Sequence, residues 1–177
     1  RPFESQFSLY LVTSVLIQFA FHLFVLNSIR NLVYSTGYEK GIFDYKIKFQ
    51  PNLMNTAMFI VTNEMEITTF IANYRGRPFM QSFFENKLLF FSILFSIFTI
   101  CLLFIDEPIF HSLFQTVPFP SVEFRNKIAI YCVIDLIVSV IIEKVCLFFF
   151  TIKNKIAAKN LVDPEVINEL KSYVPHN

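Results

Sequence analysis

The chain has 177 residues, of which 54% are apolar, and its formal net charge is +1. The basic residues are scattered rather than gathered into a stripe, and this pattern argues against a nucleic-acid partner. The apolar residues include 24 phenylalanines and stand in long runs, which favours an all-α membrane protein over a soluble domain.

The first apolar run, residues 7–26, holds twenty residues without a formal charge, which is long enough to cross a bilayer. Gln18 and His22 are four residues apart in this run, so they share one face of the helix. We expect them to form a structural hydrogen-bonded pair that faces the other helices. A polar relay or substrate contact is the alternative. A polar and aromatic connector, residues 27–53, follows.

The second span is predicted at residues 54–74, and it carries Glu64 and Glu66 near its middle. A carboxylate exposed to lipid costs about 3 kcal/mol, so this helix must face protein or water on at least one side. The two glutamates are two residues apart and therefore point to nearly opposite sides. They remain candidates for substrate or ion contact, whereas Asn55 and Asn73 are expected to be structural polar residues.

The third and fourth spans are predicted at residues 88–105 and 128–152, separated by a proline-rich surface loop. Asp135 lies inside the fourth span and needs a partner, as a bundle-facing structural carboxylate or as an ion or proton site. Residues 1–152 would thus form a four-helix transmembrane bundle. Residues 153–177 would form a cytosolic tail with a short amphipathic helix that begins near Asp163.

The sequence lacks the common catalytic and metal-binding motifs. Its three histidines are far apart, no phosphate-binding loop is present, and none of its three cysteines belongs to a CxxC pair. We therefore expect no catalytic residue, no metal and no cofactor in this chain. The first apolar run has no leader pattern of a signal peptide, and the chain begins with Arg1, so we expect it to be part of a longer protein.

The distribution of basic residues indicates a topology. Four crossings would place both ends on one side of the membrane, together with the short loop that holds Arg75, Arg77 and Lys87. Because cytosolic loops carry an excess of lysine and arginine, we expect both termini and this loop to be cytosolic.

Several short patterns, in order along the chain, resemble the C-terminal membrane region of P-type ATPases, above all the type V-A branch of the endoplasmic reticulum. The patterns span residues from Arg1 to about Phe150. They are Arg1-Pro2, Gln18-Phe19 with His22, Phe49 with Pro51, Leu53 and Asn55-Thr56, then Thr69-Phe70 with Asn73-Tyr74-Arg75-Gly76 and Pro78-Phe79-Met80, then Glu85-Asn86-Lys87, Val117-Pro118 and Glu123-Phe124.

This resemblance implies an ATP-driven transporter with an aspartyl-phosphate intermediate, similar to a dislocase that removes misinserted transmembrane helices from the endoplasmic reticulum membrane. ATP, Mg²⁺ and the phosphorylated aspartate would belong to other parts of the protein. The four helices would be the last four of the membrane domain and would support its moving part. Glu66 would then serve packing, and the role of Glu64 stays open.

The sequence is also compatible with two other functions. The first is a cation-transporting P-type ATPase in which Glu64, Glu66 and Asp135 bind the ion. The second is an unrelated four-helix membrane scaffold. The expected partners are the lipid bilayer, the other helices and cytosolic domains of the parent protein, and transmembrane helix cargo.

Overall fold

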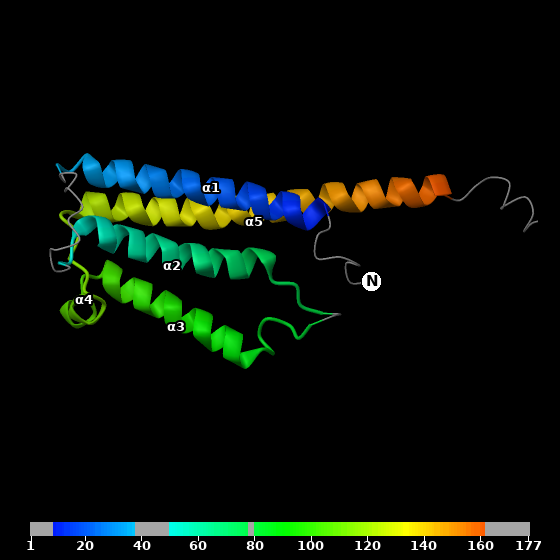
Figure 1. Cartoon of the computed structure of the whole chain (residues 1–177). Coiled ribbons are helices and arrows are strands. Elements are labelled where there is room, and N and C mark those ends of the chain that lie inside the picture. The colour runs from blue at the N-terminus through cyan, green and yellow to red at the C-terminus, as the bar shows by residue number, and fades with distance from the viewer. Residues whose placement is uncertain (1–8, 38–49, 78–79, 162–177) are drawn as a thin grey trace, which may run out of the picture.

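The computed structural model describes residues 9–37, 50–77 and 80–161, and the side chains as far as residue 153. These residues are all-α: the long helices α1 (Leu9–Tyr34), α2 (Leu53–Asn73), α3 (Lys87–Phe104) and α5 (Val122–Leu161), and the short helix α4 (Pro108–Phe114). The long helices run alternately back and forth, and α4 lies at the end where α3 is followed by α5 (Figure 1).

The core is formed mainly where α1, α2 and α5 pack against one another. Helix α3 contacts α2 on the side away from α1 and diverges from it toward the end that holds Asn73 and Lys87 (Figure 1). Most of the buried apolar residues form one cluster in the half of the bundle near α4. The members of this cluster are Val25, Ile29, Val33, Ala57, Ile60, Val61, Met65, Leu103, Phe119, Phe124, Ile128 and Cys132.

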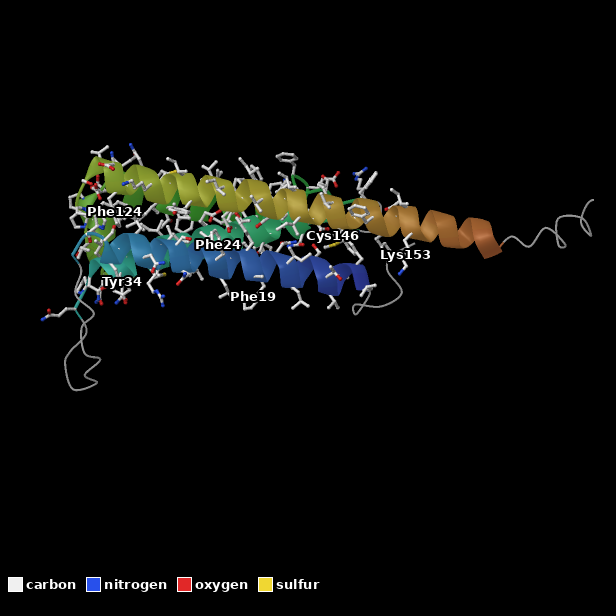
Figure 2. All side chains as sticks on the ribbon, turned by 90° about the horizontal axis from the view of Figure 1, so that it is seen from above. Phe19, Phe24, Tyr34, Phe124, Cys146 and Lys153 are labelled. Atoms are coloured by element: carbon white, nitrogen blue, oxygen red, sulfur yellow. The ribbon has the colours of Figure 1, made fainter. Side chains whose placement is uncertain are left out.

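The outer faces of the helices are apolar. Side chains such as Phe19 on α1 and Phe95 on α3 are 58% and 67% exposed, and Figure 2 shows Phe19 on the outer edge of α1. By length and composition, α1 and α3 are two helices that are able to cross a membrane. An apolar exterior around a partly polar interior is the arrangement expected of helices that face lipid.

Helix α1 is longer than the predicted span of residues 7–26, because it continues to Tyr34. Residues 27–34 were expected to belong to the connector. The apolar run ends near Leu26, but Val25, Ile29 and Val33 continue an inward-facing row with a spacing of four, and each is at most 1% exposed. This buried row extends the helix beyond the uncharged segment.

Helix α5 extends beyond its predicted span of residues 128–152 at both ends. It begins at Val122, where the side chain of Ser121 accepts a hydrogen bond from the Phe124 N–H at 3.1 Å. It continues as far as Leu161, the last residue described, because residues 153–161 contain neither glycine nor proline to stop it. The start of the expected tail is thus helical. The amphipathic helix expected near Asp163 lies outside the described residues.

Helices α2 and α3 each lie within one residue of their predicted bounds, 54–74 and 88–105. The side chain of Asn52 caps α2 by accepting a hydrogen bond from the Asn55 N–H, and Asn86 caps α3 in the same way through the Leu89 N–H. The proline-rich segment expected as a surface loop contains α4, which has Pro108 in its first turn.

Candidate functional site

Polar side chains line the interior of the bundle along two helices. On α1 they recur every fourth residue, at Tyr10, Ser14, Gln18 and His22, and on α5 they recur at Asp135, Ser139 and Glu143. Residues that are four apart share a helix face, so each set forms one stripe. Most of these side chains are buried, and Ser14, Asp135 and Ser139 are each 0% exposed.

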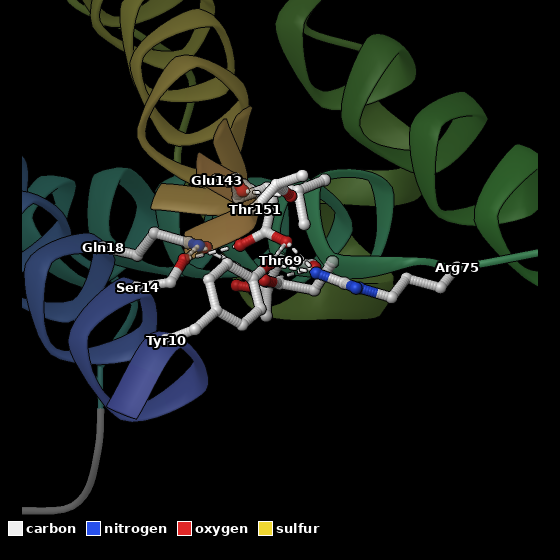
Figure 3. Close-up of polar contacts among 9 residues, drawn as sticks. Tyr10, Ser14, Gln18, Thr69, Arg75, Glu143 and Thr151 are labelled. Carbon is white, nitrogen blue, oxygen red and sulfur yellow. Dashed lines mark hydrogen bonds and ion pairs between the residues drawn. The ribbon is translucent and has the colours of Figure 1, made fainter. Parts of the chain in front are cut away.

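The Glu143 cluster is formed by Tyr10, Ser14, Arg75 and Glu143 (Figure 3). It lies at the end of the bundle where α1 begins and α2 ends. Ser14 donates a hydrogen bond to Glu143 Oε2 at 2.5 Å, and the Tyr10 hydroxyl donates to Oε1. The Arg75 guanidinium lies 3.0 Å from the same Oε1 and also covers the Tyr10 ring, 4.9 Å from its centroid. A single buried carboxylate on α5 is thereby bonded to α1 and to the segment that follows α2.

Next to this cluster, Gln18 on α1 and Asn73 on α2 form a reciprocal amide pair. Asn73 Nδ2 donates to Gln18 Oε1 at 3.0 Å, and Gln18 Nε2 donates to Asn73 Oδ1 at 3.2 Å. Gln18 Nε2 also donates to Ser14 Oγ at 2.9 Å, which links the pair to the Glu143 cluster. The prediction that Gln18 would pair with His22 is wrong, because each side chain finds a partner on a facing helix instead.

The central cluster, formed by His22, Glu64 and Asp135, lies deeper in the bundle. His22 Nδ1 is 2.9 Å from Asp135 Oδ1, and this contact joins α1 to α5. Glu64 on α2 accepts a hydrogen bond from Thr68 at 2.5 Å and is near enough to Asp135 and His22 to interact with both electrostatically. Three helices thus contribute one ionisable side chain each.

Each member of the central cluster has a buried polar atom without a hydrogen-bond partner among the described residues. These atoms are His22 Nε2, Glu64 Oε2 and Asp135 Oδ2. A buried polar atom that forms no hydrogen bond is costly, so such atoms need an explanation. Asp135 stands out, because it is 0% exposed and only one of its oxygens is bonded.

Glu66 lies apart from the central cluster. It is exposed and lines a groove of about 390 Å³ between α2 and α3, together with Asn63, Ser92 and Ser96. The structure therefore brings Glu64 and Asp135 together and leaves Glu66 on a different face. Asn55 is exposed in the first turn of α2 and is not part of either cluster.

The described residues contain no group of three histidine, cysteine, aspartate or glutamate side chains placed to hold a metal ion. The cysteines Cys101, Cys132 and Cys146 are all free. The Glu143 cluster, the Gln18–Asn73 pair and the His22–Asp135 contact together join α1, α2 and α5 through hydrogen bonds and ion pairs inside the bundle.

The predicted site residues did not include Tyr10, Ser14, Arg75 or Glu143. The sequence feature that could have identified two of them is the spacing of four residues from Tyr10 through Ser14 and Gln18 to His22. This spacing extends the Gln18–His22 pattern toward the N-terminus. Glu143 lies two such steps after Asp135. Polar residues that recur along one face of an apolar helix indicate a protein-facing stripe.

The chain was compared with known proteins, and no family model matches it. The chain is 35% identical over 148 residues to the endoplasmic reticulum transmembrane helix translocase spfA of Aspergillus fumigatus, which covers 82% of this chain and 11% of the relative. The length of this alignment is similar to that of the segment that carries the resemblance, Arg1 to about Phe150. The chain is homologous to a segment of the type V P-type ATPases.

Two further relatives of this P-type ATPase family match shorter parts of the chain. The endoplasmic reticulum transmembrane helix translocase of Schizosaccharomyces pombe is 36% identical over 94 residues, which are 53% of this chain and 8% of the relative. The probable manganese-transporting ATPase PDR2 of Arabidopsis thaliana is 37% identical over 95 residues, again 53% of this chain and 8% of the relative. The matches thus span about a tenth of the length of these relatives. By homology, α1 to α5 are part of the membrane region of a P-type ATPase.

Proposed function

We propose that this chain is the C-terminal support bundle of an ATP-driven translocase that removes misinserted transmembrane helices from the endoplasmic reticulum membrane. The observation that carries the proposal is the similarity of most of the chain to a protein named as a transmembrane helix translocase. In this proposal the chain belongs to an enzyme, although it contributes no catalytic residue. ATP and Mg²⁺ bind elsewhere in the parent protein.

The packing of the bundle supports a static rather than a moving role. The Glu143 cluster, the Gln18–Asn73 pair and the His22–Asp135 contact all join helices of the core. Within a low-dielectric interior such contacts resist separation, because a broken contact leaves polar groups unsatisfied. A bundle held together by these contacts is able to stay rigid while other helices of the parent protein move against it.

We also propose that α2 and α5 cross the membrane together with α1 and α3, with both termini in the cytosol. The polar side chains Glu64, Asp135 and Glu143 face the interior of the bundle, so they do not prevent α2 and α5 from lying in lipid. The loop with Arg75 and Arg77 then lies at the cytosolic surface. Partners in this scheme are the bilayer, the other domains of the parent protein and the transmembrane cargo.

The test uses the full-length protein that contains this chain, reconstituted in liposomes with a fluorescent tail-anchored protein. We expect ATP with Mg²⁺ to release the tail-anchored protein, and a non-hydrolysable ATP analogue to fail. ATP hydrolysis without release of any helix would contradict the proposal.

Cation transport is the second candidate function, because one relative is named as a probable manganese-transporting ATPase. It predicts that Mn²⁺ or another cation stimulates ATP hydrolysis, and that neutralising Glu64 or Asp135 abolishes this stimulation. Since Glu66 lies on another face, Glu66→Gln serves as the matched control and should leave any stimulation unchanged.

A further inference from the structure

A cavity of about 350 Å³ lies between α2 and α3, near the loop that joins them. The apolar and aromatic side chains that line it include Ile71, Tyr74, Phe83, Phe90, Leu94 and Ile97. Helix α3 diverges from α2 toward this end (Figure 1), and Ile71, Leu94 and Ile97 are 40%, 49% and 41% exposed. The cavity is therefore open to the surroundings of the bundle, and its volume is within the range of about 300–1,000 Å³ that ligand sites occupy.

The cavity has the depth of one membrane leaflet. Its wall on α3 follows one row of side chains at spacings of three and four residues, which are Lys87, Phe90, Leu94 and Ile97. From Lys87 to Ile97 the helix rises about 15 Å, which is half of the thickness of about 30 Å of the hydrocarbon core. A hydrocarbon chain that enters beside Lys87 thus reaches the end of the cavity near the middle of the membrane.

The end of the cavity beside Lys87 has the character of a membrane interface with a positive charge. Lys87 is exposed and forms no ion pair with the described residues, whereas Arg77 is paired with Glu85. The charge of Lys87 is therefore not compensated by its neighbours. Phe84, which is 76% exposed, lies in the same segment, and aromatic side chains are common at the level of lipid headgroups.

The space on the other side of the same helix pair is different in polarity. Ile93 lines both spaces and is only 6% exposed, so it separates them. The groove beyond it is lined by the polar side chains of Asn63, Glu66, Ser92 and Ser96. An acyl chain would leave these polar groups without partners, whereas in the cavity it meets only side chains that gain from the burial of apolar surface.

We propose that this cavity binds one acyl chain of an anionic glycerophospholipid, whose phosphate contacts the ammonium group of Lys87. The apolar lining, the depth of one leaflet and the uncompensated charge at one end together match such a lipid. Helix α3 is apolar enough to cross a membrane, so lipid is present at the site. The bound lipid holds α2 and α3 together where they diverge. This inference rests on the proposed membrane position of α2 and does not depend on ATP-driven helix removal.

The test uses purified full-length protein in detergent, with added phosphatidylserine or phosphatidylcholine that have the same acyl chains. Native mass spectrometry counts the retained lipids, and the unfolding midpoint measures their effect. We expect phosphatidylserine to be retained and to raise the midpoint more than phosphatidylcholine does. Glycerophosphoserine, which has the headgroup without the chains, should have no effect. Equal responses to the two lipids, or an equal response to glycerophosphoserine, overturn the proposal.

Two variants assign the retained lipid to this cavity. Leu94→Trp fills the cavity and should abolish retention of one phosphatidylserine, whereas Ile130→Trp, at a position that is 57% exposed on α5, is the matched control and should retain it. Lys87→Ala should lower the preference for phosphatidylserine about fivefold, because a lysine near an anionic headgroup contributes about 1 kcal/mol.

The outcome against the proposal is equally specific. If a helix of the parent protein covers the cavity, neither Leu94→Trp nor Lys87→Ala changes lipid retention, and this result overturns the proposal. If Leu94→Trp does not fold, the exposed substitution Lys87→Ala decides the question, with Lys87→Arg as the variant that should keep the preference. ATP hydrolysis is not measured in this test, so its failure is distinct from a failure of the proposed function.

Discussion

Arg75 and Glu143 join segments that are 68 residues apart in the sequence, with a distance of 3.0 Å from Arg75 Nη2 to Glu143 Oε1. The carboxylate is only 5% exposed, whereas the guanidinium is 39% exposed. This contact therefore places a buried negative charge under a cation that reaches the surface. It connects the start of the loop after α2 to the C-terminal half of α5.

Removal of the Arg75 side chain should destabilise the protein strongly. Arg75→Ala leaves the buried Glu143 without its cation, and because the guanidinium is 39% exposed we expect a loss of about 1–3 kcal/mol, below the cost for a fully buried pair. The unfolding midpoint of the full-length protein measures this loss. Arg77→Ala is the matched control, because Arg77 and Glu85 form an exposed pair whose loss costs about 0–1 kcal/mol. Equal effects of the two variants would show that the Arg75–Glu143 contact does not stabilise the bundle.

The amide pair between α1 and α2 gives a second prediction. Asn73→Leu leaves the buried Gln18 Oε1 without its donor, so we expect a loss of about 1–3 kcal/mol in unfolding free energy. The double variant Gln18→Leu/Asn73→Leu should recover part of this loss, because no unpaired amide remains. Thr62→Val should have little effect, because Thr62 is exposed and its hydroxyl donates to backbone carbonyls of α2 itself. A double variant no more stable than Asn73→Leu would contradict the pairing.

Glu66→Gln should be tolerated. The side chain lines the groove between α2 and α3 and makes no hydrogen bond or ion pair with the described residues, and glutamine keeps its size and hydrogen-bonding capacity. We expect a change within about 0.5 kcal/mol in unfolding free energy and unchanged ATP hydrolysis. Strong loss of activity in a normally folded protein would show that Glu66 has more than a structural role.

The loop between α2 and α3 should respond to acid. Hydrogen bonds from the Ser82 N–H and from Arg77 hold the pKa of Glu85 below its usual value. A carboxyl with a lowered pKa stabilises the folded state above its unfolded pKa, and this contribution is lost as the pH falls through the folded pKa. The protection of the Ser82 amide, measured as its exchange rate relative to the intrinsic rate at the same pH, should therefore decrease in acid. In Glu85→Ala, which removes the acceptor, the protection of Ser82 should be low at every pH, and a protected Ser82 in that variant would contradict the account.

The sequence predicted α2 and α3 well, because each is bounded by local signals. Asn52 and Asn86 are favourable caps, and Gly76 and Pro108 interrupt helices. The ends of α1 and α5 were missed, because the end of an apolar run was taken as the end of the helix. A helix does not have to stop where its residues become polar, provided that one face stays buried.

The interior contacts were only partly predictable. The position of Asp135 in an apolar run indicated a buried partner, and the position of Glu64 opposite Glu66 indicated two different environments. The identity of the partners depends on which helices pack together and in which register. His22 therefore could not be assigned to Asp135, nor Arg75 to Glu143, before the packing of α1, α2 and α5 was known.

Formation of a phosphorylated intermediate is the most direct test of the ATP-driven function proposed for this chain. Purified full-length protein is incubated with labelled ATP and Mg²⁺, quenched in acid and assayed for bound phosphate. We predict a covalent phosphoprotein that hydroxylamine cleaves, as expected of an aspartyl phosphate, and that still forms in Glu66→Gln. A full-length protein that binds no phosphate covalently, under conditions in which it is folded, would contradict the assignment to an ATP-driven translocase.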